Sequence, residues 1–344
     1  MFSKLKKPDD IYIIAEVGQN HQGSVNVAIE FIREFSRLGV HAIKFQVRDN
    51  KSLFSKEKYN SVYNSENAFG ETYGEHREAL ELSKEDLILI KNECHKNKVE
   101  FMATAFDEKS LDLLLDIDVD VLKIASFDLG NLKLIKAFAM SKKPIVLSIG
   151  GGKIDHLKAT IELIEKYTND FAILHCVSEY PCPAERLGLN NITNLKESFK
   201  GHTIGLSDHF NGVLSGPISY MFGARVFEKH VTLNRAWKGT DHSFALEAKG
   251  FSDFVRDIKR VPQMMNLKPS EDLGKEYVFK KLGKTLILEK DINKDDIITI
   301  DHLGGIIDDN DDIPIRQSFE FVDKKALISC KKGDKISYKL IKED

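Results

Sequence analysis

Two lysines, Lys44 and Lys123, lie inside apolar stretches of the sequence, where a charged group needs a partner. Their surroundings read AIKFQV and VLKIAS. A buried ammonium group is costly unless a carboxylate or a bound anion faces it. Two such lysines indicate an anionic ligand, although an internal salt bridge to Glu16 or Glu228 would also satisfy either of them.

Two histidines offer a second kind of chemistry. His209 follows the run IGLSD and His230 follows VFEK, so that neighbouring strands could aim both imidazoles at one spot. Two histidines beside carboxylates leave coordination positions open for water and substrate, which suits a catalytic divalent ion better than a closed zinc site. We therefore predict a metal on His209 and His230. His175 and His202 stand before or within strands, and we interpret them as structural.

A glycine-rich segment follows another apolar run. Residues 148–152 read Ser-Ile-Gly-Gly-Gly. Glycines let bare backbone N–H groups approach a phosphate closely. The segment is therefore a candidate phosphate loop, and a simple tight turn would explain the same glycines.

These polar residues stand near the ends of eight β-rich runs that alternate with helical segments. The runs are 11–16, 41–47, 100–104, 119–126, 144–148, 171–178, 203–207 and 225–231. Residues 27–39 show helical spacing, and Gly39 ends that helix. Eight β/α units over about 260 residues are typical of a (β/α)8 TIM barrel, whose active site lies at the carboxyl ends of the strands. We predict this α/β fold.

The pattern changes near residue 262. Residues 263–281 are rich in Lys, Glu, Asn and Pro and have weak apolar periodicity, so they are predicted to be a linker. Residues 282–344 contain short β-like runs broken by Asn-Lys-Asp and Lys-Gly-Asp turns. We predict a catalytic barrel over 1–262, a linker over 263–281 and a small β-rich domain over 282–344.

Composition excludes several classes of function. The 344 residues carry 50 Lys and Arg against 53 Asp and Glu, a net charge of −3, so no broad field attracts nucleic acid or an anionic membrane. No stretch approaches the ~18 apolar residues of a membrane helix. Four cysteines without a CxxC pair fit a reducing compartment. We expect a cytoplasmic protein with no nucleic-acid or membrane partner.

Seven segments of the chain resemble the sialic acid synthase family, in order and along the whole chain. They are AEVGQNHQG (15–23), IKFQ (43–46), KIAS (123–126), HCVSEYPCP (175–183), IGLSDH (204–209), FEKHVTL (227–233) and GTDHSFALE (239–247). The resemblance implies a TIM barrel followed by a small antifreeze-like domain of the SAF, or β-clip, type. It also implies a transferase that joins phosphoenolpyruvate to N-acetylmannosamine or a related amino sugar, with water added and phosphate released.

The resemblance implies a role for each matching residue. The metal, Mn²⁺ or Mg²⁺, would lie on His209 and His230. The phosphoenolpyruvate pocket would comprise Lys44, Thr104, Lys123, Ser126 and Ser148, with Ser207 nearby. The sugar-facing set would comprise Gln46, Ser178, Tyr180 and Asp241. Glu16 resembles the essential carboxylate near the reacting carbons, and Glu228 and Asp241 complete the expected catalytic set.

The chain departs from the family pattern in its C-terminal part. Family members commonly carry an Arg-Pro-Gly segment whose arginine reaches the N-acyl group of the sugar across a domain-swapped homodimer. Here the aligned segment is His302-Leu303-Gly304-Gly305. An imidazole does not reproduce the donor fork of a guanidinium. We expect a homodimer in which His302 faces a sugar other than N-acetylmannosamine.

Two other functions remain open from the sequence. A metal-dependent sugar aldolase or isomerase can also place histidines and carboxylates over a TIM barrel, but it would not need two barrel lysines and a phosphate loop. A non-catalytic sugar-phosphate-binding protein is the third possibility. The combination of Glu16, two lysines and two histidines argues against it.

Overall fold

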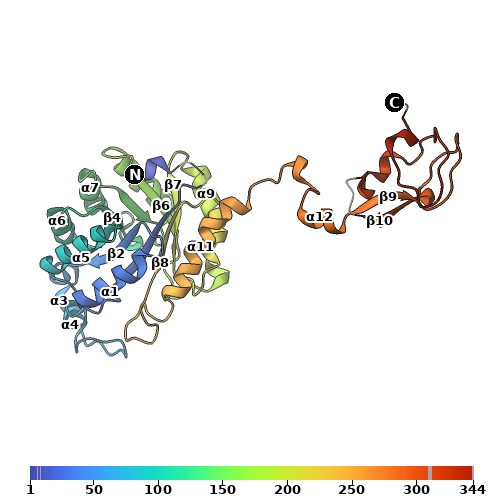
Figure 1. The fold of residues 1–344 in the computed structure, drawn as a ribbon. Helices are drawn as coiled ribbons and strands as arrows, with labels where there is room; N and C mark the ends of the chain where they lie inside the picture. The colour runs from blue at the N-terminus through green and yellow to red at the C-terminus, as the bar shows by residue number, and fades with distance from the viewer. Residues whose placement is uncertain (6, 8, 309–311, 343–344) are drawn as a thin grey trace. The chain divides into compact units, whose positions relative to one another are not determined.

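The computed structural model describes residues 1–5, 7, 9–308 and 312–342 (Figure 1). The chain divides into two compact units, Met1–Met265 and Asn266–Asp344. Each unit has its own hydrophobic core.

The first unit is a closed barrel of eight parallel strands in sequential order, which confirms the predicted fold. The strands are β1 Tyr12–Gly18, β2 Ala42–Val47, β3 Glu100–Ala105, β4 Val121–Ile124, β5 Ile145–Ser148, β6 Phe171–Cys176, β7 Thr203–Asp208 and β8 Val226–His230. Each predicted run contains or overlaps one strand. The largest difference is at 119–126, where β4 ends at Ile124 and a 3₁₀ turn, η2 Ser126–Asp128, begins.

Helices surround the barrel and alternate with its strands (Figure 1). They are α1 Val25–Ser36, α5 Lys84–Lys96, α6 Glu108–Asp116, α7 Leu132–Met140, α8 Ile154–Glu165, α9 Asn191–Ser198, α10 Ser215–Met221 and α11 Ala248–Met264. The backbone N–H of Val27 donates to the Ser24 side chain, which begins α1. Gly39 adopts φ +86° shortly after this helix, as its predicted terminating role requires.

An insertion between β2 and α5 holds three short helices. They are α2 Asn50–Leu53, α3 Lys56–Tyr59 and α4 Tyr73–Glu78. The side chain of Thr72 caps α4 by accepting from the backbone N–H of Glu75, and the backbone N–H of Thr72 donates to the Glu75 carboxylate. The insertion therefore has a defined local structure, although its helices are short.

The barrel interior is apolar at the amino end of the strands and polar at the carboxyl end. Side chains on a strand alternate between faces, so residues two apart point the same way. Ile14 is followed by Glu16, Ala42 by Lys44, and Val226 by Glu228, with the first member of each pair in the interior cluster. Phe2, from the short 3₁₀ helix η1 Phe2–Lys4, is fully buried in this apolar cluster. The switch from apolar to polar places the functional groups at one end.

The second unit is small and contains little regular structure. Its antiparallel strands are β9 Lys284–Leu288 and β10 Leu303–Ile307, joined by single bridges to neighbouring turns. The remaining elements are η4 Ser270–Asp272, α12 Tyr277–Leu282, η5 Ile300–His302, η6 Ile315–Glu320 and η7 Tyr338–Leu340. Leu286, Leu288, Ile298 and Phe321 form its buried core. The assignment of this unit as a SAF domain stays a prediction.

The helices near the domain boundary differ in their extent from the sequence prediction. Helix α11 continues through Pro262 to Met264, and α12 overlaps the end of the predicted linker 263–281 and extends to Leu282.

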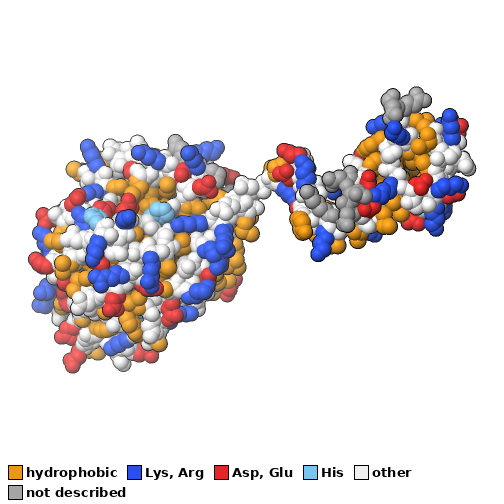
Figure 2. Space-filling model, in the orientation of Figure 1, with side chains coloured by type: hydrophobic (Ala, Val, Ile, Leu, Met, Phe, Trp, Pro, Cys, Tyr) orange, Lys and Arg blue, Asp and Glu red, His pale blue; other side chains and the backbone are white. Residues whose placement is uncertain are grey.

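On the face that Figure 2 shows, basic and acidic side chains are interspersed, as expected from a net charge of −3. No helix in the described part of the chain is long and apolar enough to span a membrane.

The packing of α5 against the barrel generates a stability prediction. Ile90 is fully buried, whereas the adjacent Leu89 is half exposed on the same helix. We expect Ile90→Ala to lower the free energy of unfolding by about 2–5 kcal/mol, because it leaves a cavity in the core. Leu89→Ala, the matched control, should cost less than about 1 kcal/mol. Urea titration followed by circular dichroism measures both, and equal losses would contradict the described packing.

Candidate active site

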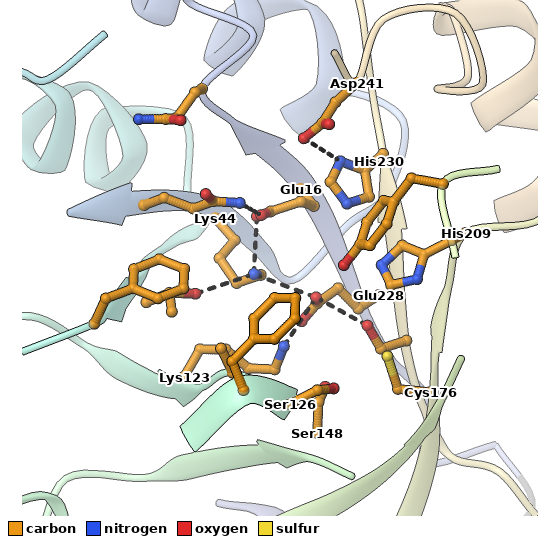
Figure 3. A pocket seen from close by; sticks show the side chains of 18 of the residues that line it. Glu16, Lys44, Lys123, Ser126, Ser148, Cys176, His209, Glu228, His230 and Asp241 are labelled. Carbon is orange, nitrogen blue, oxygen red and sulfur yellow. Dashed lines mark hydrogen bonds and ion pairs between the residues drawn. The ribbon is translucent and has the colours of Figure 1, made fainter. Parts of the chain in front are cut away.

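A cavity of about 480 Å³ lies at the carboxyl end of the barrel strands (Figure 3). Twenty-two residues line it. Those expected from the sequence are Glu16, Lys44, Gln46, Thr104, Lys123, Ser126, Ser148, Tyr180, Ser207, His209, Glu228, His230 and Asp241. The barrel thus brings most of the predicted set to one place.

Lys44 lies at the centre of the buried charges. Its Nζ lies 3.0 Å from Glu16 Oε2 and 3.2 Å from Glu228 Oε1, and it donates to Thr104 Oγ1 at 3.3 Å (Figure 3). Glu16 and Lys44 are register partners on β1 and β2, which explains their contact. Burial opposes the charge of Lys44, but Glu16 and Glu228 more than offset it and raise its pKa.

Lys123 is the second cation of the buried cluster. Its Nζ donates to Glu228 Oε1 at 3.0 Å, and Ser207 Oγ donates to the same oxygen at 3.2 Å. Burial lowers the pKa of Lys123, and Glu228 offsets this only in part. Burial also opposes ionisation of Glu228, yet Lys123 and Lys44 hold its pKa well below the usual range.

The two lysines therefore have carboxylate partners within the protein. The internal salt bridges that the sequence left open are both present, so lysine burial alone does not require a bound anion. Two buried polar atoms near the lysines could nevertheless still form hydrogen bonds. Glu228 Oε2 and Ser148 Oγ are buried and have no hydrogen-bond partner.

His209 directly follows β7 and His230 ends the adjacent strand β8, and their ring centroids are 5.4 Å apart. His209 Nδ1 donates to the carbonyl of Val177 at 2.7 Å. Burial opposes the charge of His209, but its hydrogen bond with Cys176 more than offsets this and raises its pKa. His230 Nδ1 is buried without a hydrogen-bond partner and lies 3.7 Å from Asp241 Oδ2. Burial lowers the pKa of His230 and so favours the neutral imidazole that binds metals.

This donor set fits a divalent ion with open positions. The described residues contain no group of three or more His, Cys, Asp or Glu side chains arranged to hold a metal. A metal on His209 and His230 would therefore take further ligands from substrate or water, as a catalytic site requires. The carbonyl of Val177 orients the first ring, and Asp241 lies next to the second.

Aromatic rings and the amide of Gln46 lie in the part of the site that is predicted to face the sugar. The ring of Tyr180 lies 4.0 Å from that of His209, and Phe244 packs against His230 at 5.2 Å. Gln46 Nε2 donates to Glu16 Oε1 at 2.7 Å. Gln46 therefore holds the carboxylate that the resemblance assigns to the reacting carbons.

Two parts of the predicted set do not line the cavity. Ser178 is not among the lining residues, and its Oγ lies next to Gly150, where an added Cβ would come within 2.6 Å of it. The glycines of the candidate phosphate loop also lie outside the cavity wall, and the N–H of Gly150 already donates to Ser126 Oγ at 3.0 Å. Three polar atoms lie so close to Gly150 that a larger residue would not fit there. This crowding supports the interpretation of the segment as a tight turn.

His302 belongs to the second compact unit. It ends η5, and its Nδ1 accepts a hydrogen bond from the backbone N–H of Thr299 at 3.0 Å. Its predicted role toward a sugar stays a prediction.

The sequence analysis missed nine residues of the cavity wall. They are Gln19, Arg48, Asn67, Arg77, Ala125, Phe106, Phe127, Cys176 and Thr240. One of them had a signal: Lys44, Gln46 and Arg48 are two apart, so the alternation of β2 places all three on one face. It also missed Lys229, which is fully buried and pairs with Asp208 at 2.7 Å behind the site.

The chain is similar to known proteins along most of its length. Residues 31–269 match the NeuB family. The N-acetylneuraminate-9-phosphate synthase of Drosophila melanogaster is 38% identical, over 84% of each chain, and that of Homo sapiens is 30% identical over 96% of this chain and 92% of its own. The N,N'-diacetyllegionaminic acid synthase of Legionella pneumophila is 31% identical over 86% of each chain.

A solved structure of a sialic acid synthetase has a similar fold. The N-acetylneuraminic acid synthetase of Leptospira borgpetersenii superposes with a TM-score of 0.68 at 29% identity, covering 79% of this chain and 92% of that one. Fold and cavity together define a TIM-barrel enzyme of the sialic-acid-synthase type. The chain belongs to the NeuB family.

The charge cluster predicts unequal effects of removing its two lysines. Lys44→Met leaves both Glu16 and Glu228 short of a cation, so we expect a loss of about 3–5 kcal/mol in the free energy of unfolding. Lys123→Met should cost about 1–3 kcal/mol, because Glu228 keeps Lys44 and Ser207. Guanidinium titration of the two variants measures the difference. A Lys123→Met loss as large as that of Lys44→Met would show that Lys44 is not the central partner.

Proposed function

We propose that this chain condenses phosphoenolpyruvate with an aldose and water, releasing phosphate, to give a 2-keto-3-deoxy sugar acid of the sialic acid type. The observation that supports it most is the shared cavity of Glu16, two lysines and two histidines in a NeuB-family barrel. The relatives' names support a sialic-acid-like product and differ in which acid they specify.

Lys44 and Lys123 bind the phosphate and carboxylate of phosphoenolpyruvate in this proposal. Both already share Glu228, so an anion adds to an organised cluster and does not have to order flexible side chains. Ser126 and Ser148 line the same side of the cavity and supply hydroxyl donors. Their combined effect is positioning and charge neutralisation.

The remaining residues act on the aldose and on water. A divalent ion on His209 and His230, Mn²⁺ or Mg²⁺, would supply Lewis-acid polarisation of the aldehyde oxygen. Carbon three of phosphoenolpyruvate forms the new bond to the aldehyde carbon, and water adds at carbon two. In this proposal Glu16, which Lys44 and Gln46 hold, takes the proton of that water. Loss of phosphate from the tetrahedral intermediate then gives the 2-keto acid.

Location and assembly are part of the proposal. All four cysteines are unpaired, as in a reducing compartment, which supports a cytoplasmic protein. We propose the homodimer from the family resemblance, and sedimentation velocity would measure it.

The function is tested by a coupled assay. The protein is incubated with phosphoenolpyruvate, Mn²⁺ and a panel of hexosamines, with phosphate release and product mass recorded together. We expect phosphate to appear only when an aldose is present, with one product of combined mass. An aldolase or isomerase would act on the sugar without phosphoenolpyruvate, and a binding protein would release no phosphate. Glu16→Gln should lower kcat by about 10²–10⁴-fold.

The metal assignment has a separate test. Excess chelator should abolish turnover and added Mn²⁺ should restore it, because the donor set at His209 and His230 leaves open positions for substrate. The double variant His209→Ala/His230→Ala should bind no Mn²⁺ in equilibrium dialysis. His95→Ala, at a surface pair with Asp120, is the control and should bind normally. Full activity in excess chelator would exclude the metal.

A further inference from the structure

A buried ion pair lies directly behind the proposed metal site. Lys229 Nζ is 2.7 Å from Asp208 Oδ2, and neither side chain is exposed. The two residues are register partners on the adjacent strands β8 and β7. Neither of them lines the cavity, whereas the residues on both sides of each one do. Because side chains alternate along a strand, the pair points away from the cavity and toward the surrounding helices.

The surroundings of this pair are apolar. Leu206 and Phe227, the preceding outward positions on the two strands, belong to the large hydrophobic cluster of strand and helix residues. The centre of the Phe254 ring, on α11, lies 6.0 Å from Lys229 Nζ. A buried ion pair in such a place contributes little stability beyond what apolar side chains of similar volume would give. Stability of the core therefore does not explain the pair.

The hydrogen bonds of the pair enclose His209. Asp208 Oδ1 accepts from the backbone N–H of Phe210 at 2.9 Å, and Lys229 Nζ donates to the carbonyl of Phe210. Ser215 Oγ, at the start of α10, donates to Asp208 Oδ2 at 2.5 Å. Lys229 on β8 is thus bonded to the residues on both sides of His209, and Ser215 joins Asp208 to α10.

The same pair connects the two imidazoles through their backbones. Asp208 directly precedes His209, and Lys229 directly precedes His230. The ion pair therefore joins the two strands one residue before each histidine, and the ring centroids of the histidines are 5.4 Å apart. With only two protein ligands, metal affinity depends strongly on how well those ligands are oriented. Groups that orient metal ligands commonly contribute about 10–100-fold in affinity.

We propose that Lys229 and Asp208 are positioning residues of the metal site, which hold His209 and His230 at the separation that a divalent ion requires. The inference rests on the proposed function for the assignment of the metal to these histidines. It adds two residues that contact neither the metal nor the substrates. Their contribution is to fix the backbone at the ends of β7 and β8, so that metal binding does not have to order the two ligands first.

Glu228, which also neighbours Lys229, does not depend on this pair. Its carboxylate is held by Lys44 and Lys123, and Ser207 donates to it. Substitution of the pair should therefore weaken metal binding more than it weakens the anion pocket of the two lysines.

The experiment measures Mn²⁺ affinity and stability in the same variants. Lys229→Met alone leaves the Asp208 carboxylate buried without its cation, so its thermal midpoint should fall by about 10 °C. The double variant Asp208→Asn/Lys229→Met leaves no charge of the pair, so its midpoint should return to within about 3 °C of the wild-type value. Its dissociation constant for Mn²⁺, measured by electron paramagnetic resonance without substrates, should nevertheless stay about 10–100-fold above that of the wild type.

Two further measurements separate a positioning role from general distortion of the barrel. In the double variant, the KM for phosphoenolpyruvate at saturating Mn²⁺ should change by less than about threefold, because Lys44 and Lys123 keep Glu228. Lys249→Met/Asp253→Asn, at a solvent-accessible pair on α11, makes the same two substitutions and should change neither Mn²⁺ affinity nor KM. Wild-type Mn²⁺ affinity in the Asp208→Asn/Lys229→Met variant, or equal losses toward Mn²⁺ and phosphoenolpyruvate, would overturn the proposal.

A milder variant tests the same role if the double variant folds poorly. Ser215→Ala keeps both charges and removes one hydrogen bond to Asp208. Its dissociation constant for Mn²⁺ should rise by about 2–10-fold, the usual effect of one hydrogen bond. Unchanged Mn²⁺ affinity in Ser215→Ala, together with an unfolded double variant, would mean that the pair is structural and would refute the positioning role.

Failure of this inference is distinguishable from failure of the proposed function. Phosphoenolpyruvate-dependent turnover in a wild type that binds Mn²⁺ no more tightly than the folded double variant would overturn the positioning role and leave the synthase intact. Tighter Mn²⁺ binding by the wild type, without any phosphoenolpyruvate-dependent turnover, would support the positioning role and refute the synthase. A wild type that binds no Mn²⁺ would overturn the metal assignment and this inference together.

Discussion

The functional end of the barrel depends on one buried cluster of four charges, Lys44, Lys123, Glu16 and Glu228. The four charges compensate one another, because the nearest layer of the barrel interior beneath them is apolar. Hydrogen bonds with Gln46, Thr104 and Ser207 add to this compensation. The register of the parallel strands makes the cluster possible by aligning Glu16 with Lys44 on one side and with His230 on the other. Any shift of register by one residue would bury these charges among the helices.

This cluster also determines how an anionic substrate can be held. Because the lysines already have carboxylate partners, a bound phosphate shares them and does not find bare cations. A polyanion adjoining a neutral cluster needs additional positive charge from outside it. The cavity offers such charge at Arg48 and Arg77, and the divalent ion that we propose at the histidine pair would add to it. The arrangement therefore separates positioning of the reacting carbons from neutralisation of the substrate's ends.

The sequence analysis was most accurate for features that repeat along strands. Eight β-rich runs gave the barrel, and Lys44, Lys123, His209 and His230 could be placed in one cavity because they stand at strand ends. It says less about features that a local contact decides. Ser178 follows β6 but is not among the residues that line the cavity, and a Cβ at Gly150 would meet the hydroxyls of both Ser126 and Ser178. Pattern alone carries no information about such packing.

The residues that the pattern missed share a physical reason. Asn67 and Arg77 lie in the insertion between β2 and α5, where helices of four to six residues have too few turns to show periodicity. Arg48 stands one residue past β2, and only continuing the strand's alternation beyond its end would have found it. Residues on the strands are constrained by the barrel, whereas the insertion can vary without disturbing it. Asn67 and Arg77 therefore reach the cavity from the part of the chain that the barrel constrains least.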